Sequence, residues 1–180
     1  VVTGDIVHSK LDMSPELIKM LIEFFQGFTI PTIVILGNHD MNLNNLYRLD
    51  AISPILDGFV DSNIIFIKDN EVFEYGGITW NHMAVDITPN EYIRGTDIDA
   101  DYKIALHHGA VDTATTDIGY TISNKHVTTE NFKGHDLVLL GDIHKPAQFL
   151  NDKKTIGYPG SLIQQNHGEA LEHGILVWDV

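Results

Sequence analysis

The sequence predicts a single α/β unit, because short apolar strands alternate with helical segments along its 180 residues. Two observations carry this prediction. The apolar, β-branched run over residues 32–36 is typical of a strand that is covered on both faces. Several predicted strands also end in polar side chains, often after a glycine, as in sheets whose loops form a binding crevice. The length fits one domain, since domains usually hold about 100–200 residues.

Two helices are predicted, and the first has clear end signals. Ser14 supplies an N-cap, Pro15 suits the first turn, and Gly27 follows the last apolar position. Between these ends, apolar side chains recur every three or four residues, as on one face of a helix. A second, shorter helix is predicted over residues 44–52, before Pro54.

The other predicted elements are strands, with no internal repeat or linker between them. A hairpin is indicated at Gly76-Gly77, which separates two alternating runs. In chain order, the predicted strands cover residues 1–3, 32–36, 63–67, 71–75, 78–83, 102–106, 137–140, 155–158 and 174–178.

The composition excludes several classes of protein. It is 43% hydrophobic and 20% charged, as in ordinary globular proteins, and no apolar run approaches the roughly 18 residues of a membrane span. The absence of cysteine excludes disulfides and thiolate metal sites, so that a metal would need His, Asp, Glu or Asn ligands. The net charge of −14 argues against a general surface that wraps nucleic acid.

Four strand ends carry side chains of the metal-ligand type: TGDIVH, LGNHD, LHHG and LGDIH. Each alone has an ordinary explanation as a polar turn or a partly buried histidine pair. It is improbable that all four strands end this way independently. Oxygen and imidazole ligands suit Mn²⁺, Fe²⁺, Zn²⁺ or Co²⁺, and a pair of such ions can clamp the oxygens of a phosphoryl centre. The pattern therefore predicts phosphoester hydrolysis.

In this order, the four motifs resemble those of the calcineurin-like metallophosphoesterases. The family pattern is an opening Asp-x-His, then Gly-Asp, Gly-Asn-His-Asp, a His before a Gly, and Gly-His-x-His. The resemblance implies a two-sheet β-sandwich flanked by helices, in four α/β/β/α layers, over residues 1–180. The chain departs from the pattern twice: it shows no opening Asp-x-His, and Asp142 stands where a histidine is usual. We expect a domain that lacks its first strand and any C-terminal DNA-capping region.

Two further stretches resemble the SbcD-type nuclease subunits and their phage counterparts: His8, three residues after Asp5, and YPGSLIQQNHGE over residues 158–169. The resemblance implies a DNA exonuclease or endonuclease of repair or recombination that works with an SbcC-like ATPase. It also implies a cytoplasmic location in a bacterium or phage-infected cell, without secretion or membrane attachment, and is compatible with a homodimer. Two alternatives stay open: an enzyme for small phosphoesters or phosphoproteins, which the negative charge favours, and a scaffold without catalysis.

The resemblance also implies a role for each matching residue. Two divalent ions are expected, with Mn²⁺ first among the candidates. Asp5 would bridge them, the first would be bound by His144, and the second by the remaining ligands. The expected metal ligands are Asp5, Asn38, His107, Asp142 and His144. The choice of His107 over His108 follows the family's spacing to the next glycine, since strand alternation says only that one of the two points inward.

Three residues are expected to take part in catalysis without binding metal. His39 would stabilise the transition state or protonate the leaving oxygen, and Asp40 would orient its ring. His8 would contact the scissile phosphate. The other histidines are expected to be surface or structural residues: His82, His126, His135, His167 and His173.

Overall fold

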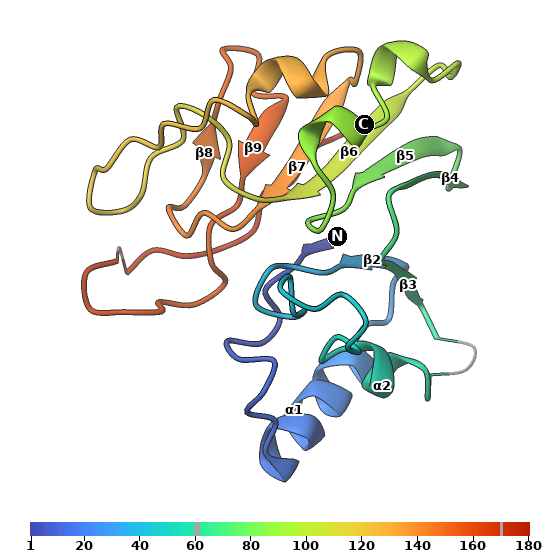
Figure 1. The fold of residues 1–180 in the computed structure, drawn as a ribbon, viewed down its shortest axis with the longest axis vertical. Helices are drawn as coiled ribbons and strands as arrows, with labels where there is room; N and C mark the ends of the chain where they lie inside the picture. The colour runs from blue at the N-terminus through green and yellow to red at the C-terminus, as the bar shows by residue number, and fades with distance from the viewer. Residues whose placement is uncertain (60–61, 170) are drawn as a thin grey trace.

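The structure is a computed structural model that describes residues 1–59, 62–169 and 171–180. Within these residues the strands form one three-stranded and one six-stranded sheet, which pack face to face (Figure 1). No helix in the described part of the chain is long and apolar enough to cross a membrane. The two-sheet sandwich that the resemblance implied is confirmed.

The elements follow the predicted order closely. The first sheet and its helices comprise β1 (Val2–Thr3), α1 (Pro15–Gln26), β2 (Thr32–Ile35), α2 (Ser53–Leu56) and β3 (Ile64–Ile67). The second sheet comprises β4 (Glu71–Tyr75), β5 (Ile78–Met83), β6 (Lys103–His108), β7 (Leu137–Gly141), β8 (Gln148–Phe149) and β9 (Ile156–Tyr158). Three 3₁₀ helices lie among the described residues: η1 (Pro89–Glu91), η2 (Gly95–Asp97) and η3 (Thr129–Phe132).

Parallel pairing determines where the strand ends lie. The first sheet has the order β1-β2-β3 and is parallel. The second has the order β4-β5-β6-β7-β9-β8, in which β5, β6, β7 and β9 run parallel and the edge strands β4 and β8 pair antiparallel. Because parallel strands end at the same edge of a sheet, the loops after β1 and β2 meet those after β6 and β7.

Three clusters of buried side chains hold the layers together. The first sheet packs α1 on its outer face, through Leu21 and Phe25 against Val34 (Figure 1). The space between the sheets is filled from both sides, for example by Ile35 of β2 and Leu106 of β6. The outer face of the second sheet is covered by 3₁₀ helices and loops, so the fourth layer has less regular helix than the resemblance implied.

Helix α1 forms for the reasons read from its sequence. The hydroxyl oxygen of Ser14 accepts a hydrogen bond from the backbone N–H of Leu17 at 3.2 Å, which satisfies one free donor of the first turn. Pro15 follows at the first helical position. The helix ends at Gln26, and the N–H of Gly27 closes its last turn.

The helix predicted over residues 44–52 is wrong, because this stretch folds as consecutive turns. Two asparagines compete with a helical backbone. The side-chain oxygen of Asn42 accepts from the N–H of Asn44 at 3.1 Å, and that of Asn45 accepts from Tyr47 at 3.2 Å. Regular helix begins only at α2, where Pro54 lies in the first turn.

The strand predicted over residues 174–178 is also wrong, since these residues join no ladder. The segment is held by Trp178, whose indole N–H donates to the carbonyl of Lys154 at 3.0 Å. Its ring packs edge-on against Phe149 of β8. With only two residues, β8 was too short to be predicted from its own pattern.

Candidate metal centre

Asp5 enters the centre from the turn after β1. Gly4 and Asp5 both have positive φ, at 88° and 54°, so the chain leaves the strand sharply. The Oδ1 atom of Asp5 accepts from the N–H of His39 at 3.0 Å and lies 3.3 Å from Nε2 of His108. Burial alone would raise the pKa of Asp5, but the adjacent His108 ring and the His39 N–H together lower it.

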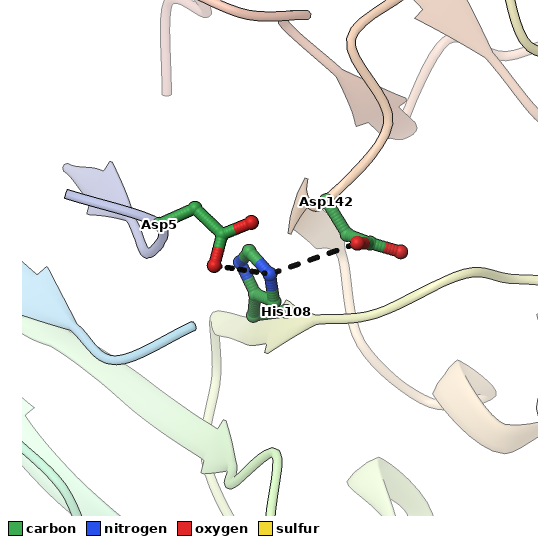
Figure 2. A group of neighbouring side chains, drawn as sticks. All are labelled: Asp5, His108 and Asp142. Atoms are coloured by element: carbon green, nitrogen blue, oxygen red, sulfur yellow. Dashed lines mark ion pairs between the residues drawn. The ribbon is translucent and has the colours of Figure 1, made fainter. Parts of the chain in front are cut away.

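His108 is buried, and Figure 2 shows its ring between the carboxylates of Asp5 and Asp142. Its Nδ1 lies 2.7 Å from the carbonyl oxygen of Thr3, which fixes a proton there because a carbonyl can only accept. Its Nε2 faces oxygen atoms of Asp5 at 3.3 Å, Asn38 at 3.0 Å and Asp142 at 3.9 Å. Burial lowers the pKa of His108, but the carboxylate of Asp5, the carbonyl of Thr3 and the carboxylate of Asp142 outweigh it, and the net shift is upward.

Glycines make room for this ring. A glycine precedes each of Asp5, Asn38 and Asp142. A Cβ atom on any of these glycines, Gly4, Gly37 or Gly141, would come within 2.7 Å of a His108 ring atom. The space they leave lets the two sheets approach each other at the strand ends. The glycine before each of Asp5, Asn38 and Asp142 therefore makes room for the His108 ring as well as for its own turn.

His107 faces the other side of the second sheet. Its Nδ1 lies 3.0 Å from the carbonyl oxygen of Met83, and its ring packs against Tyr92 and Phe132. Burial lowers the pKa of His107 to about 4. The structure corrects the sequence expectation here, because it brings His108 to the carboxylates and encloses His107 in the core.

Asp142 follows β7 and has a φ of 92°, which aspartate tolerates better than most residues. Its ligand atom lies within 4.8 Å of those of Asp5 and His108. Burial raises the pKa of Asp142 and the charge of Asp5 raises it further, while His108 and His144 oppose the shift. A cation at this point would relieve the repulsion between the two carboxylates.

Asp40 does not orient the ring of His39, contrary to expectation. It is fully buried, and its two carboxylate oxygens accept from the N–H groups of Val7 at 3.0 Å and Gly37 at 2.8 Å. It thereby ties the loop after β1 to the loop after β2. Burial raises the pKa of Asp40 to about 6 despite these two hydrogen bonds.

The raised pKa of Asp40 leads to a prediction for the metal-free chain. Because the folded state favours the protonated acid, Asp40 contributes stability that is complete below its unfolded pKa of 3.8 and is lost as the pH rises through about 6. This contribution is at most about 3 kcal/mol. Asp40→Asn cannot titrate, so urea unfolding in chelator should show a shallower fall in stability between about pH 4 and pH 7. An unchanged pH slope would contradict the assignment.

His39 and His8 form a stacked pair beside the carboxylates, with ring centroids 5.4 Å apart. The Nδ1 of His39 lies 2.7 Å from the carbonyl oxygen of His8, and this contact orients the ring. The backbone N–H of His39 donates to Asp5. Lys10 reaches the same place, since its ammonium group donates to the carbonyl of Asn38 at 3.0 Å.

His144 lies near Asp142 but outside the tight group of carboxylate and imidazole atoms. Its ring is 45% exposed, and its Nδ1 lies 2.7 Å from Oε1 of Glu169. The Glu169 side chain is only 4% exposed. Sequence reasoning did not assign a role to Glu169, although it ends the stretch over residues 158–169 that was singled out.

The remaining five histidines do not belong to the group formed by Asp5, His108 and Asp142. His82 and His135 are held by backbone carbonyls, of Asp69 and Phe132 respectively, and burial lowers the pKa of both. His173 contacts Ser161. The other two, His126 and His167, are exposed.

The donors fit a divalent cation. Two carboxylates and one amide oxygen from three loops converge on one imidazole nitrogen at the end of β6, and thiolates are absent from the sequence. The Nδ1–H of His108 is held by a backbone carbonyl, which is the usual second contact of a histidine ligand. Proton and metal would compete for Nε2, so metal affinity should fall at low pH.

Comparison with known proteins agrees with this geometry. Residues 1–146 match the model of the calcineurin-like phosphoesterase family. The chain is also similar to uncharacterized protein R555 of Acanthamoeba polyphaga mimivirus, at 41% identity over 192 residues, which covers all of this chain but 14% of that protein. The family match includes the loops after β1, β2 and β7 and the end of β6, which carry the donors. The chain therefore belongs to the calcineurin-like phosphoesterase family.

Proposed function

We propose that the chain hydrolyses phosphodiester bonds in DNA with two divalent cations, Mn²⁺ first among them. The observation that carries the proposal is the convergence of Asp5, Asn38, His108 and Asp142 beside a pair of stacked histidines. Membership of a phosphoesterase family supports the ester-bond chemistry. The chain spans 14% of its viral relative, so the activity and partners of a longer protein are proposals as well.

One cation would be held by the four convergent donors, which are Asp5, Asn38, His108 and Asp142. Asp5 and His144 would contribute to the site of a second cation. The chemistry that bound divalent cations supply in such centres is polarisation of a phosphoryl oxygen and a lowered pKa for water. The chain itself holds the ligands in place from rigid strands. Asp40 keeps the two loops of the first sheet together, and the glycines keep His108 against them.

His39 is the proposed proton donor. Its Nδ1–H donates to the carbonyl of His8, so the proton passed to the leaving oxygen would be the second proton of the imidazolium form, carried on Nε2. His8 is exposed and stacks on His39, where it can contact a phosphate oxygen. Lys10 adds a positive charge beside this pair, through its contact with Asn38.

DNA as the substrate, an SbcC-like ATPase as the partner and a role in repair or recombination rest on the SbcD-like stretches. The contact between Glu169 and His144 supports them, because it ties the stretch over residues 158–169 to the site. The net charge of −14 favours the second candidate, a hydrolase for small phosphoesters or phosphoproteins.

A substrate panel tests the proposal. The chain is assayed with Mn²⁺ on single- and double-stranded DNA, on a small aryl phosphodiester and on the matching monoester. Release of nucleotides from DNA supports the nuclease. Turnover of small esters without turnover of DNA favours the second candidate, and metal binding without any turnover favours a scaffold without catalysis.

The role of His39 gives a prediction for the same assay. His39→Ser should reduce turnover by about 10²–10⁴-fold, the range for a positioned general acid, with nearly unchanged metal content. Asn38→Ala serves as the comparison, because it removes an oxygen donor and should reduce metal content. Equal metal loss in the two variants would show that His39 is itself a ligand.

A further inference from the structure

The Nδ1 atom of His144 contacts Glu169, a residue that lies outside the family motifs. Glu169 reaches the ring from a loop 25 positions along the chain, and its Oε1 lies 2.7 Å from Nδ1. The ring is almost half exposed, while the carboxylate is 4% exposed. A buried carboxylate against an exposed imidazole is costly unless other donors satisfy it.

Those donors are present in the loop itself. The Oε2 atom of Glu169 accepts from the backbone N–H of Gln165 at 2.6 Å, and Oε1 accepts from the side-chain amide of Asn166 at 2.8 Å. The carbonyl of Glu169 in turn accepts from the side chain of Gln164 at 3.3 Å. Residues 164–169 are therefore folded around this one carboxylate.

This arrangement determines which nitrogen of His144 carries the proton. An ionised carboxylate is only an acceptor, so Nδ1 must donate to it. A neutral His144 ring then keeps its lone pair on Nε2. His108 shows the same arrangement with a backbone carbonyl in place of the carboxylate, its Nδ1 on Thr3 and its Nε2 toward the acidic group.

We propose that Glu169 is a positioning residue that holds His144 in the Nδ1–H form and so presents Nε2 as a ligand for a divalent cation. The metal part rests on the proposed function, since it takes the centre to bind metal. The stretch over residues 158–169 then has a physical role, because its last residue, Glu169, orients the ring of His144 in the loop after β7.

The first test measures the tautomer in metal-free chain, where catalysis has no part. Long-range ¹H–¹⁵N spectra at about pH 8, above the ordinary histidine pKa of roughly 6.5, distinguish the two forms. Wild type should show Nδ1–H at His144, Glu169→Leu should lose this preference, and Glu169→Gln should retain part of it through its amide oxygen. Glu172→Leu and Glu172→Gln are matched controls, because Glu172 is exposed on the same segment.

The second test titrates the same variants with Mn²⁺ and follows free Mn²⁺ by electron paramagnetic resonance. Affinity should fall about 10–100-fold in Glu169→Leu, the range for partners that orient metal ligands, with Glu169→Gln between it and wild type. Circular dichroism checks folding, and Glu169→Gln carries the test if the leucine variant does not fold. An unchanged tautomer or an unchanged Mn²⁺ affinity in a folded variant overturns the proposal. Failure of wild type to cleave DNA would overturn the nuclease but leave both measurements valid.

Discussion

Replacing His108 with Ala is expected to abolish tight metal binding, while replacing His107 with Ala should leave metal binding largely intact. The reason is that only the His108 ring points at Asp5, Asn38 and Asp142. Loss of a direct ligand should exceed the roughly 10–100-fold effect known for orienting partners. Both rings are buried, so both variants should lose stability, by about 2–5 kcal/mol for His107 if it behaves like other large core side chains.

Metal analysis after dialysis, paired with urea unfolding in chelator, separates the two effects. In His108→Ala the metal should be lost even where the protein stays folded. In His107→Ala the unfolding midpoint should fall while the stoichiometry of bound metal holds. Loss of metal from folded His107→Ala with full retention in His108→Ala would restore the assignment made from the sequence.

Among glycine-to-alanine replacements in the described part of the chain, Gly141→Ala should lower stability and metal affinity the most. A Cβ there would overlap the carbonyl oxygen of Thr3 and lie 2.7 Å from Nδ1 of His108. Neither neighbour is the flexible end of a side chain, so the strands must move apart. Overpacking of this kind costs about 1–3 kcal/mol and occasionally more. The same shift would break the hydrogen bond that orients His108, so metal affinity should fall with stability.

Gly174 is the matched control, because a Cβ at that position meets nothing within 4 Å and its φ is not in the left-handed region. Gly174→Ala should leave both the thermal midpoint and the metal affinity unchanged. If Gly141→Ala behaved like the control, the close approach of β1 to β7 at this point would not be required for the site.

Local signals were sufficient for most elements. The N-cap at Ser14 and the glycine pair at residues 76–77 produced the expected helix and hairpin. Local signals failed where the structure of a segment depends on contacts with other parts of the chain. Residues 44–52 have helical spacing of apolar side chains, yet Leu46 and Leu49 are exposed, because no face of the sandwich receives them.

The histidine pair shows a second limit of the sequence. Alternation along β6 places Ile104, Leu106 and His108 on one face and Ala105 and His107 on the other. Both faces are apolar, so the sequence alone does not say which of them meets the first sheet. The structure decides it, since Ile104 and Leu106 pack between the sheets and Ala105 packs on the outer face.

The role of Asp40 was missed for a related reason. Its position beside His39 suggested a contact between neighbours, but its partners are Val7, 33 positions earlier, and Gly37. Backbone N–H groups leave no trace in a residue pattern. A buried carboxylate that joins two loops through them becomes visible only when the fold is known.

The donors are divided between the two sheets: Asp5 and Asn38 follow strands of the first, whereas His108 ends β6 and Asp142 follows β7 in the second. A cation bound by all four donors would link the first sheet to the second. Its binding energy then adds to the cohesion of the fold, by RT ln(1 + [M]/Kd) for each ion. Without a cation the carboxylates of Asp5 and Asp142 repel each other, whereas a bound cation would attract both and so hold the two sheets together at this point. Removal of such a metal with a chelator should therefore lower the stability of the contact between the two sheets as well as remove the proposed cofactor.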